Sequence, residues 1–119
     1  MSDQTDLISR VRFNDQGLVP VIAQQWDSGE VLMMAWMNQE ALQITLESGQ
    51  ATYFSRSRSR LWIKGETSGN FQQVRSLRLD CDGDTILLEV DQHGVACHTG
   101  ARSCFDTELS AQPTVLVTP

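Results

Sequence analysis

The sequence predicts a β-rich α+β fold, in which antiparallel strands and one main helix form a single compact domain. Short apolar runs separated by turn residues are the pattern of such strands, and only one segment has helical spacing. The chain has 119 residues, of which 40% are hydrophobic, enough for a core of its own. We therefore expect one domain over residues 1–119, with its core in about residues 18–105 and with loosely held ends.

Turn and cap residues define the individual elements. The polar residues 27–30 separate two apolar runs and predict a hairpin. Asn38 can cap a helix that has Glu40 in its first turn and ends at Gly49. Further apolar runs after this helix predict more strands. The expected strands cover residues 18–26, 31–37, 51–55, 61–64, 74–80 and 85–91.

Charge and hydropathy exclude two classes of partner. The net charge of −6 argues against general nucleic-acid binding, which depends on neutralising phosphates. No apolar run approaches the roughly 18 residues of a membrane-spanning helix, and the first residues lack the pattern of a signal peptide. We expect a cytoplasmic protein without a membrane partner. Its three cysteines are an odd number, so they cannot close a disulfide framework and are free for metal binding or catalysis.

The densest group of reactive side chains lies in residues 80–104. This window contains all three cysteines, one of the two histidines and three alternating aspartates. Thiolates suit zinc, whereas carboxylates suit magnesium or manganese. A chain that gathers both sets of ligands so closely is expected to be a metal-dependent catalyst.

The aspartates allow two interpretations. Asp82 and Gly83 stand between apolar runs and predict a two-residue hairpin turn. In an extended backbone, Asp80, Asp82 and Asp84 would project to one side and Cys81 to the other. Three such carboxylates form a candidate magnesium site. The two interpretations do not exclude each other.

The cysteines also allow two interpretations. Cys81, Cys97 and Cys104 stand 16 and 7 positions apart, unlike the close pairs of structural zinc sites, and free cysteines are often buried as small apolar side chains. Alternatively, three protein ligands leave one position of a tetrahedral zinc open, as in catalytic sites. His98, beside Cys97, is then the candidate base, unless it is an ordinary polar side chain. We interpret His93 as a turn residue.

Basic residues are concentrated in one short segment. Four of the nine Lys and Arg residues fall in residues 56–64: Arg56, Arg58, Arg60 and Lys64. If this run is extended, three guanidiniums lie on one side and suit a phosphate; the alternative is a charged edge strand. Residues 64–70 contain two glycines and two hydroxyls, and they can present backbone N–H groups to an anion. We expect a phosphorylated metabolite as ligand, and we expect Trp36 and Trp62 in the core.

Three segments of the chain together are similar to one known family. Residues 62–70 read WIKGETSGN, residues 80–84 read DCDGD, and residues 96–105 read ACHTGARSCF. In this order, and with residues 53–58, they resemble the monofunctional phosphoribosyl-AMP cyclohydrolases of histidine biosynthesis. The likeness runs from about Leu18 to Phe105 and so covers most of the chain.

The resemblance implies a hydrolase that opens the adenine ring of phosphoribosyl-AMP between nitrogen 1 and carbon 6 with a zinc-activated water. It implies a homodimer that shares zinc ligands between chains, with one zinc per subunit and with magnesium. Zinc would be held by Cys81, Cys97 and Cys104, and magnesium by Asp80, Asp82 and Asp84. We assign proton transfer to His98. Substrate binding is assigned to Arg56, Arg58, Lys64, Thr67, Ser68 and Asn70.

Two non-enzymatic functions compete with this interpretation. A zinc-dependent interaction module would account for the cysteines, but it leaves the three aspartates and the arginine run without a role. A redox-sensing thiol protein is a more distant alternative. Opening of the purine ring, tested with and without a chelator, discriminates the enzyme from both.

Overall fold

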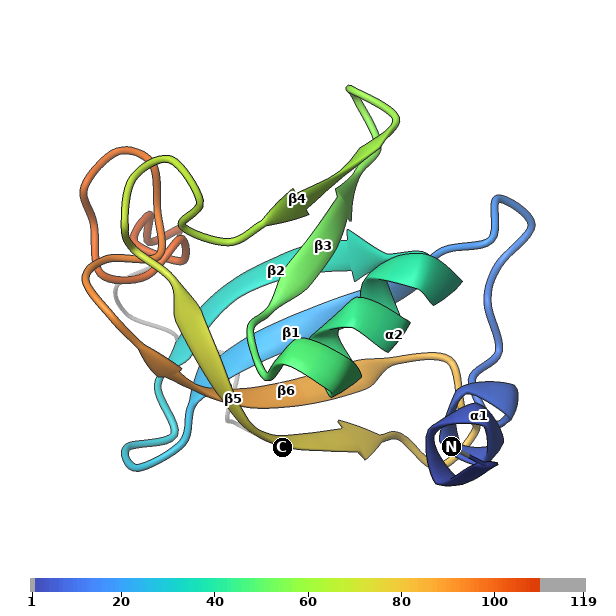
Figure 1. Ribbon diagram of the computed structural model, residues 1–119. Helices are drawn as coiled ribbons and strands as arrows, with labels where there is room; N and C mark the ends of the chain where they lie inside the picture. The colour runs from blue at the N-terminus through green and yellow to red at the C-terminus, as the bar shows by residue number, and fades with distance from the viewer. Residues whose placement is uncertain (1, 110–119) are drawn as a thin grey trace.

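The structure, a computed structural model, describes residues 2–109 of the chain. It contains two helices and six strands (Figure 1). In chain order they are α1 (Ser2–Ser9), β1 (Val19–Gln25), β2 (Val31–Met37), α2 (Gln39–Ser48), β3 (Thr52–Ser55), β4 (Arg60–Ile63), β5 (Gln72–Leu79) and β6 (Ile86–Gln92).

The main sheet has four strands in the order β2-β1-β6-β5, and β3 and β4 form a separate two-stranded sheet. Each hairpin is antiparallel, whereas the two central strands, β1 and β6, pair in parallel. The prediction of a β-rich, compact single domain is confirmed, but the main sheet is mixed. Turn signals are local and do not determine how two hairpins pair with each other. The parallel contact is therefore a result of tertiary packing.

Helix α2 begins and ends where the sequence predicts. The Asn38 side chain accepts a 2.8 Å hydrogen bond from the backbone N–H of Ala41, which satisfies one of the free donors of the first turn. Gly49 adopts the left-handed conformation with φ 76°, and its N–H donates to the Thr45 oxygen at 3.0 Å. A side chain at this position would be strained. These two caps set the ends of α2, so the chain leaves the helix at Gly49 and enters β3 at Thr52.

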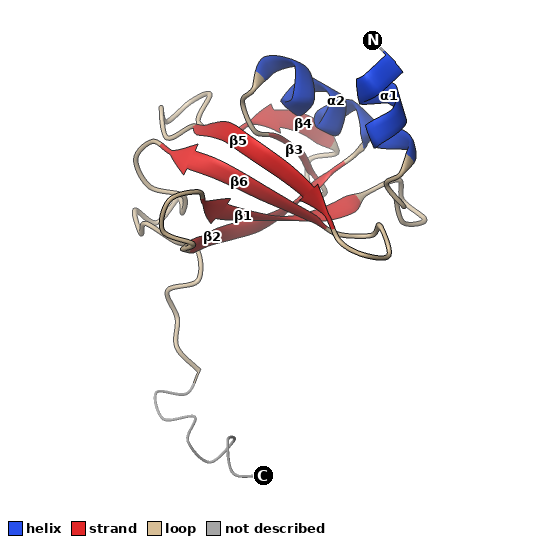
Figure 2. Cartoon of the chain, turned by 90° about the horizontal axis from the view of Figure 1, so that it is seen from below, coloured by secondary structure: helices blue, strands red, loops and turns tan. Residues whose placement is uncertain are grey.

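The core lies between the main sheet, α2 and β3. Both central strands alternate buried and half-buried residues along their length. Figure 2 shows both helices on the same face of the main sheet. From this layer Ala41, Leu42 and Tyr53 pack into the core, and all three are almost completely buried. Burial of Tyr53 brings a polar group inward, and its hydroxyl donates to Gln72 Oε1 at 2.6 Å.

Helix α1 differs from the expectation for the N-terminal segment, in which the sequence indicates no element. Ile8 is buried in the core, because α1 contacts α2. The following segment is tied to the main sheet by the Arg12 N–H, which donates to the Gly83 oxygen at 2.7 Å. Within the described chain, neither helix has the length and apolar character that a bilayer crossing requires.

The two segments that carry the candidate metal ligands lie at opposite ends of the main sheet (Figure 1). Residues 80–85 connect β5 to β6, and residues 93–105 follow β6. The length of β6 therefore separates them. The 7 residues of β6 are separated by six steps of about 3.4 Å, so the strand spans roughly 20 Å.

Candidate active site

The segment after β6 folds into a small loop that carries Cys97 and His98; we call residues 94–104 the thiol loop. Its base is closed by the Ala96 N–H, which donates to the Arg102 oxygen at 3.0 Å. The Cys97 N–H donates to the Ala101 oxygen at 3.2 Å. Beyond the base, the Cys104 N–H donates to the Leu32 oxygen at 2.7 Å and fixes this cysteine on β2.

Cys97 and Cys104 lie close enough for their thiols to interact, and their protonation differs. The Thr99 hydroxyl donates to Cys97 Sγ at 3.0 Å and lowers the pKa of the Cys97 thiol. Burial, and then the neighbouring charge of Cys97, raise the pKa of Cys104. The Cys97 thiol therefore loses its proton more readily than the Cys104 thiol, and the thiolate is the form that binds zinc.

Lys64 is the basic residue next to the two thiols. Its Nζ atom donates to the Ala96 oxygen at 2.6 Å. Burial lowers the pKa of Lys64, and the nearby Cys104 and Cys97 thiolates partly oppose this shift. The amine therefore lies beside the thiols in a half-buried setting, where charge interactions are stronger than in water.

Cys81 lies apart from the other two thiols. It is exposed in the connection between β5 and β6, at the far end of the main sheet (Figure 1). Within residues 2–109 of one chain, the three Sγ atoms do not form a cluster within 4.8 Å of one another. A single chain therefore offers a two-thiol site, and the third predicted ligand faces solvent elsewhere.

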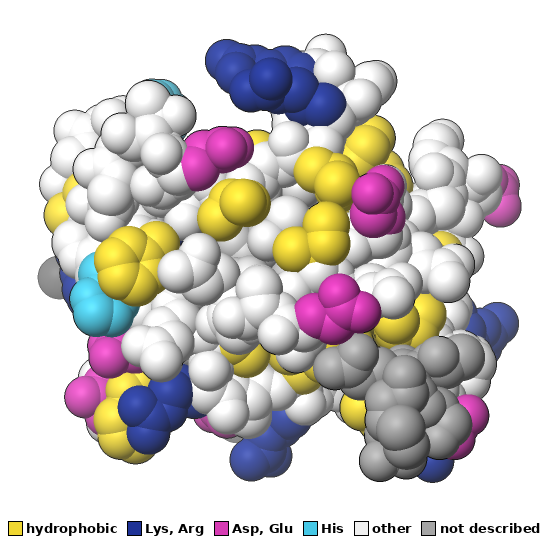
Figure 3. Space-filling model, in the orientation of Figure 1, with side chains coloured by type: hydrophobic (Ala, Val, Ile, Leu, Met, Phe, Trp, Pro, Cys, Tyr) yellow, Lys and Arg dark blue, Asp and Glu magenta, His cyan; other side chains and the backbone are white. Residues whose placement is uncertain are grey.

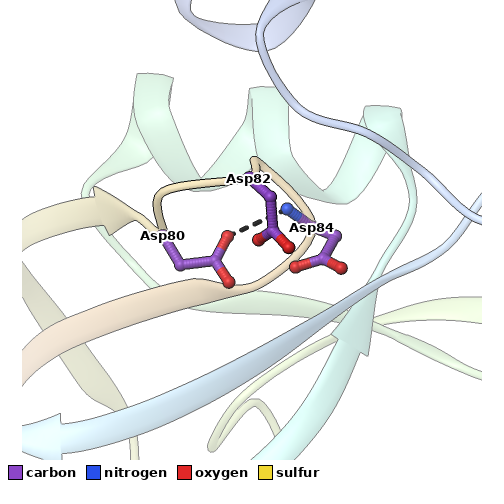
Figure 4. Close-up of side chains that lie close together, drawn as sticks. All are labelled: Asp80, Asp82 and Asp84. Carbon is purple, nitrogen blue, oxygen red and sulfur yellow. Dashed lines mark hydrogen bonds between the residues drawn. The ribbon is translucent and has the colours of Figure 1, made fainter.

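The three aspartates converge. Oxygen atoms of Asp80, Asp82 and Asp84 all lie within 4.8 Å of one another (Figure 4). The backbone between them turns at Gly83, which has φ 80°, and the Asp84 N–H donates to Asp80 Oδ1 at 2.9 Å. Both interpretations of this segment are thus compatible. The turn, however, extends over residues 80–85 rather than two residues, because the carboxylate of Asp80 organises it.

Mutual interaction shifts the protonation of these carboxyls. The Asp82 pKa is raised by its side-chain hydrogen bond with Asp84, and then by the hydrogen bond and charge of Asp80. For Asp80, desolvation raises the pKa, but the hydrogen bonds with Asp84, Thr85 and Asp82 together outweigh it and the net pKa is lowered. Carboxylates that lie this close repel one another, and a shared hard cation relieves this repulsion.

A cleft of about 460 Å³ lies beside the thiol loop. Its wall combines basic side chains, a glycine-containing loop, an indole and the side chain at the tip of the thiol loop. The lining residues are Ser55, Arg58, Arg60, Trp62, Lys64, Gly65, Glu66, Thr67, Ser68 and His98. Five residues that the sequence assigns to substrate or catalysis therefore share one cavity: Arg58, Lys64, Thr67, Ser68 and His98.

The loop of residues 64–70 is held in a tight shape. The Gly69 N–H donates to the Gly65 oxygen at 2.8 Å, and the Glu66 carboxylate accepts from the Ile63 N–H at 3.2 Å. Gly65 has φ 86°, and a Cβ there would collide with the backbone of Phe71. Glycine is therefore required at this position by both conformation and space.

The arginine run is not extended, so the condition for three guanidiniums on one side is not met. Residues 56–59 form the turn between β3 and β4, with Ser59 at φ 50°, because the hairpin reverses here. Arg56 consequently lies over the Trp36 ring, 4.6 Å from its centroid, outside the cleft. Figure 3 shows basic side chains gathered at the top of the molecule, over this hairpin.

The individual site assignments from the sequence leave out the other five residues of the cleft, among them Arg60 and Trp62. Arg60 is one of the three guanidiniums that the alternating run offers to a phosphate, and it lines the cleft with Arg58. Trp62 packs partly against the core, as expected, and also lines the cleft. Asn70 does not line this cleft; its side chain contacts Gly94, at the start of the thiol loop. The role assigned to Asn70 stays a prediction.

Comparison with known proteins identifies the family. A family model described as phosphoribosyl-AMP cyclohydrolase matches residues 33–106, which include every residue of the cleft and all three cysteines. A phosphoribosyl-AMP cyclohydrolase of Rhodospirillum rubrum is 68% identical over 109 residues, 92% of this chain and 76% of that protein. One of Micrococcus luteus is 60% identical over 119 residues, 100% of this chain and 94% of that protein. The chain therefore belongs to the phosphoribosyl-AMP cyclohydrolase family of hydrolases.

Proposed function

We propose that this protein hydrolyses phosphoribosyl-AMP and opens its adenine ring between nitrogen 1 and carbon 6. The observation that carries the proposal is the cleft in which Arg58, Lys64 and the loop of residues 64–70 meet His98 beside two thiols. This combination suits a phosphorylated substrate and a hydrolytic step. Because the cysteines are free, we expect the enzyme to act in the reducing cytoplasm.

Substrate binding follows from the charges of the cleft. Arg58, Arg60 and Lys64 supply three positive charges on a chain whose net charge is −6. Guanidiniums form paired hydrogen bonds with phosphate oxygens. The hydroxyls of Thr67 and Ser68 line the same wall and supply further donors. The two phosphates of the substrate would be held here, with the purine between the Trp62 side and His98.

The chemical step requires a water oxygen to bond to carbon 6 while the bond from carbon 6 to nitrogen 1 breaks. A proton must leave the water and reach nitrogen 1. His98 lies at the tip of the thiol loop and lines the cleft, so we assign this transfer to its imidazole, which has one nitrogen that can accept and one that can donate a proton. No other imidazole lines the cleft in the part of the chain that the structure describes.

The thiols fit a zinc site. The pKa of Cys97 is lowered by the Thr99 hydroxyl and Cys104 lies next to it, so two soft ligands are available beside the cleft. Zinc bound there would activate the attacking water by lowering its pKa. We propose that Cys81 of a second chain supplies the third thiolate, because Cys81 is exposed and roughly 20 Å of strand separates it from the thiol loop of its own chain.

The proposed homodimer also gives the aspartates a role. Cys81 stands within the same turn as Asp80, Asp82 and Asp84. If Cys81 reaches the thiol loop of the partner, this turn brings three carboxylates to the same cleft. Magnesium prefers carboxylate oxygens and commonly bridges to phosphates. We therefore propose that magnesium binds there and contacts the substrate.

An ultraviolet assay of ring opening tests the proposal. The protein is expected to change the absorbance of phosphoribosyl-AMP, to lose this activity after dialysis against a strong chelator, and to regain it with zinc and magnesium. Elemental analysis should find about one zinc per chain. AMP, which lacks the second phosphoribosyl group, should stay intact. Metal-loaded protein that leaves phosphoribosyl-AMP unchanged would overturn the proposed activity. Metal-free protein that works at the full rate would show that the metals take no part in catalysis.

A further inference from the structure

Arg102 lies between Cys97 and Cys104 in the sequence. Its guanidinium donates hydrogen bonds to three separate segments of the chain. Nε donates to Glu30 Oε1 at 3.3 Å, and Nη2 donates to Gln25 Oε1 at 3.1 Å. Nη1 donates to the Gly94 oxygen at 3.0 Å and to the Gln92 oxygen at 3.4 Å. One planar group thus joins the thiol loop, the end of β6 and the hairpin of β1 and β2.

The acceptors of Arg102 are themselves held in place. Gln25 is only 6% exposed, and its Oε1 also accepts from the Gln92 N–H at 2.9 Å. Its amide nitrogen donates to Asp27 Oδ1 at 3.1 Å and to Asp91 Oδ1 at 3.2 Å. Since all these partners orient the Gln25 amide, the oxygen that faces Arg102 has a fixed position. Arg102 is therefore bound to a rigid part of the main sheet.

The backbone of Arg102 connects this anchor to both thiols. The Arg102 oxygen accepts a hydrogen bond from the N–H of Ala96 at 3.0 Å, and Ala96 directly precedes Cys97. The next residue is Ser103, which directly precedes Cys104. Its hydroxyl donates to the Val31 oxygen at 2.8 Å. Displacement of Arg102 would therefore move the base of the loop on one side and the attachment of Cys104 on the other.

We propose that Arg102 is a positioning residue that fixes Cys97 and Cys104 at the separation a shared zinc requires. This inference rests on the proposed function, because it presumes that these thiols bind zinc. Without the guanidinium, the thiol loop loses its side-chain link to Gln25 and Glu30 and keeps its backbone hydrogen bonds and those from Lys64 and Ser103, so zinc must order more of the loop as it binds. That entropy cost weakens binding. A lysine cannot replace the arginine, since one ammonium cannot reach acceptors on all three sides.

The test measures zinc affinity by competition with a chelating dye under reducing conditions, for the wild type, Arg102→Gln and Arg102→Lys. Both variants are expected to bind zinc about 10- to 100-fold more weakly, the range seen when groups that orient metal ligands are removed. The matched control is Arg78→Gln, which removes an exposed arginine paired with Glu89 at 3.8 Å. Its zinc affinity should equal that of the wild type. Thermal unfolding of the metal-free proteins checks that each variant is folded.

The outcomes separate this inference from the proposed function. If the wild type binds no zinc, the proposed function fails. If the wild type binds zinc and both folded Arg102 variants bind it equally well, the positioning role is overturned. If neither Arg102 variant folds, Glu30→Gln decides, because it alters only a partly exposed acceptor. We expect about two- to fivefold weaker zinc binding from this loss, and unchanged affinity would overturn the inference.

Discussion

The side-chain amine of Lys64 donates a 2.6 Å hydrogen bond to the backbone oxygen of Ala96. Lys64 begins the glycine-containing loop, and Ala96 directly precedes Cys97. The bond therefore joins the side of the cleft suited to phosphate with the side that carries the thiols. The same amine lies 5.8 Å from the ring centroid of Trp62, so one cation contacts three parts of the wall.

The first prediction concerns the protonation of Lys64, which is the only lysine in the chain. Because burial lowers its pKa, the midpoint of its titration should lie below the ordinary value of 10.5. The folded state then holds this proton less tightly than the unfolded chain, so this group adds stability as pH rises from the folded to the unfolded pKa. NMR of the carbon-13-methylated lysine in metal-free protein measures the midpoint. A value at or above 10.5 would contradict the burial argument.

A second prediction separates the arginines of the hairpin. Arg58→Gln and Arg60→Gln should each raise the KM for phosphoribosyl-AMP by about tenfold or more, because each removes a charged donor to a phosphate. Arg56→Gln is the matched control, since Arg56 lies over Trp36 outside the cleft. It should change KM little and lower stability by about 0.5–1 kcal/mol. Steady-state kinetics and thermal unfolding measure both effects. A larger KM effect from Arg56 than from Arg60 would show that the hairpin binds substrate through its other side.

The third prediction concerns the aspartate turn. Asp82→Asn removes one of three converging charges, so metal-free protein should unfold at a higher temperature than the wild type. The reason is the raised pKa of Asp82, which makes its ionised form unfavourable in the folded state. Magnesium should stabilise the wild type and should no longer stabilise the variant. Asp15→Asn, an exposed change elsewhere, is the control.

Two results would contradict this interpretation of the turn. One is a variant that keeps full activity without magnesium while the wild type needs it. The other is an equal stabilisation of wild type and Asp82→Asn by magnesium. Either result would mean that the three carboxylates only stabilise the turn and do not bind magnesium. Differential scanning fluorimetry at low ionic strength suits the measurement, because salt screens the repulsion between exposed carboxylates.

The fourth prediction tests whether zinc ligands are shared between chains. Homodimers of Cys81→Ser and of Cys97→Ser should both be inactive, because every site lacks a thiolate. After the two variants are unfolded together and refolded, a mixed dimer has one site without both cysteines and one intact site. Random pairing then restores roughly a quarter of the wild-type activity. Native mass spectrometry confirms that mixed dimers form. Mixed dimers with no activity would mean that each chain completes its own site.

Local signals in the sequence were sufficient for the hairpins, for the caps of α2 and for the set of metal-ligand candidates. Asn38 and Gly49 determine the ends of α2 because each satisfies backbone groups within a few residues of itself. The convergence of Asp80, Asp82 and Asp84 is equally local, since one short turn holds all three. The chemical types of the ligands, and the three motifs that resemble one family, are likewise properties of the sequence.

Only the tertiary structure decided how these parts meet. The parallel pairing of β1 with β6 joins two hairpins into one mixed sheet, which no local pattern indicates. Reversal of the chain at residues 56–59 moved Arg56 out of the cleft, where an alternating run predicts it on the same side as Arg58. Arg102 acquires its four acceptors from segments up to 77 positions away in the sequence. Such contacts arise from burial and packing of the whole domain, because their free energy depends on which distant surfaces are brought together rather than on neighbouring residues.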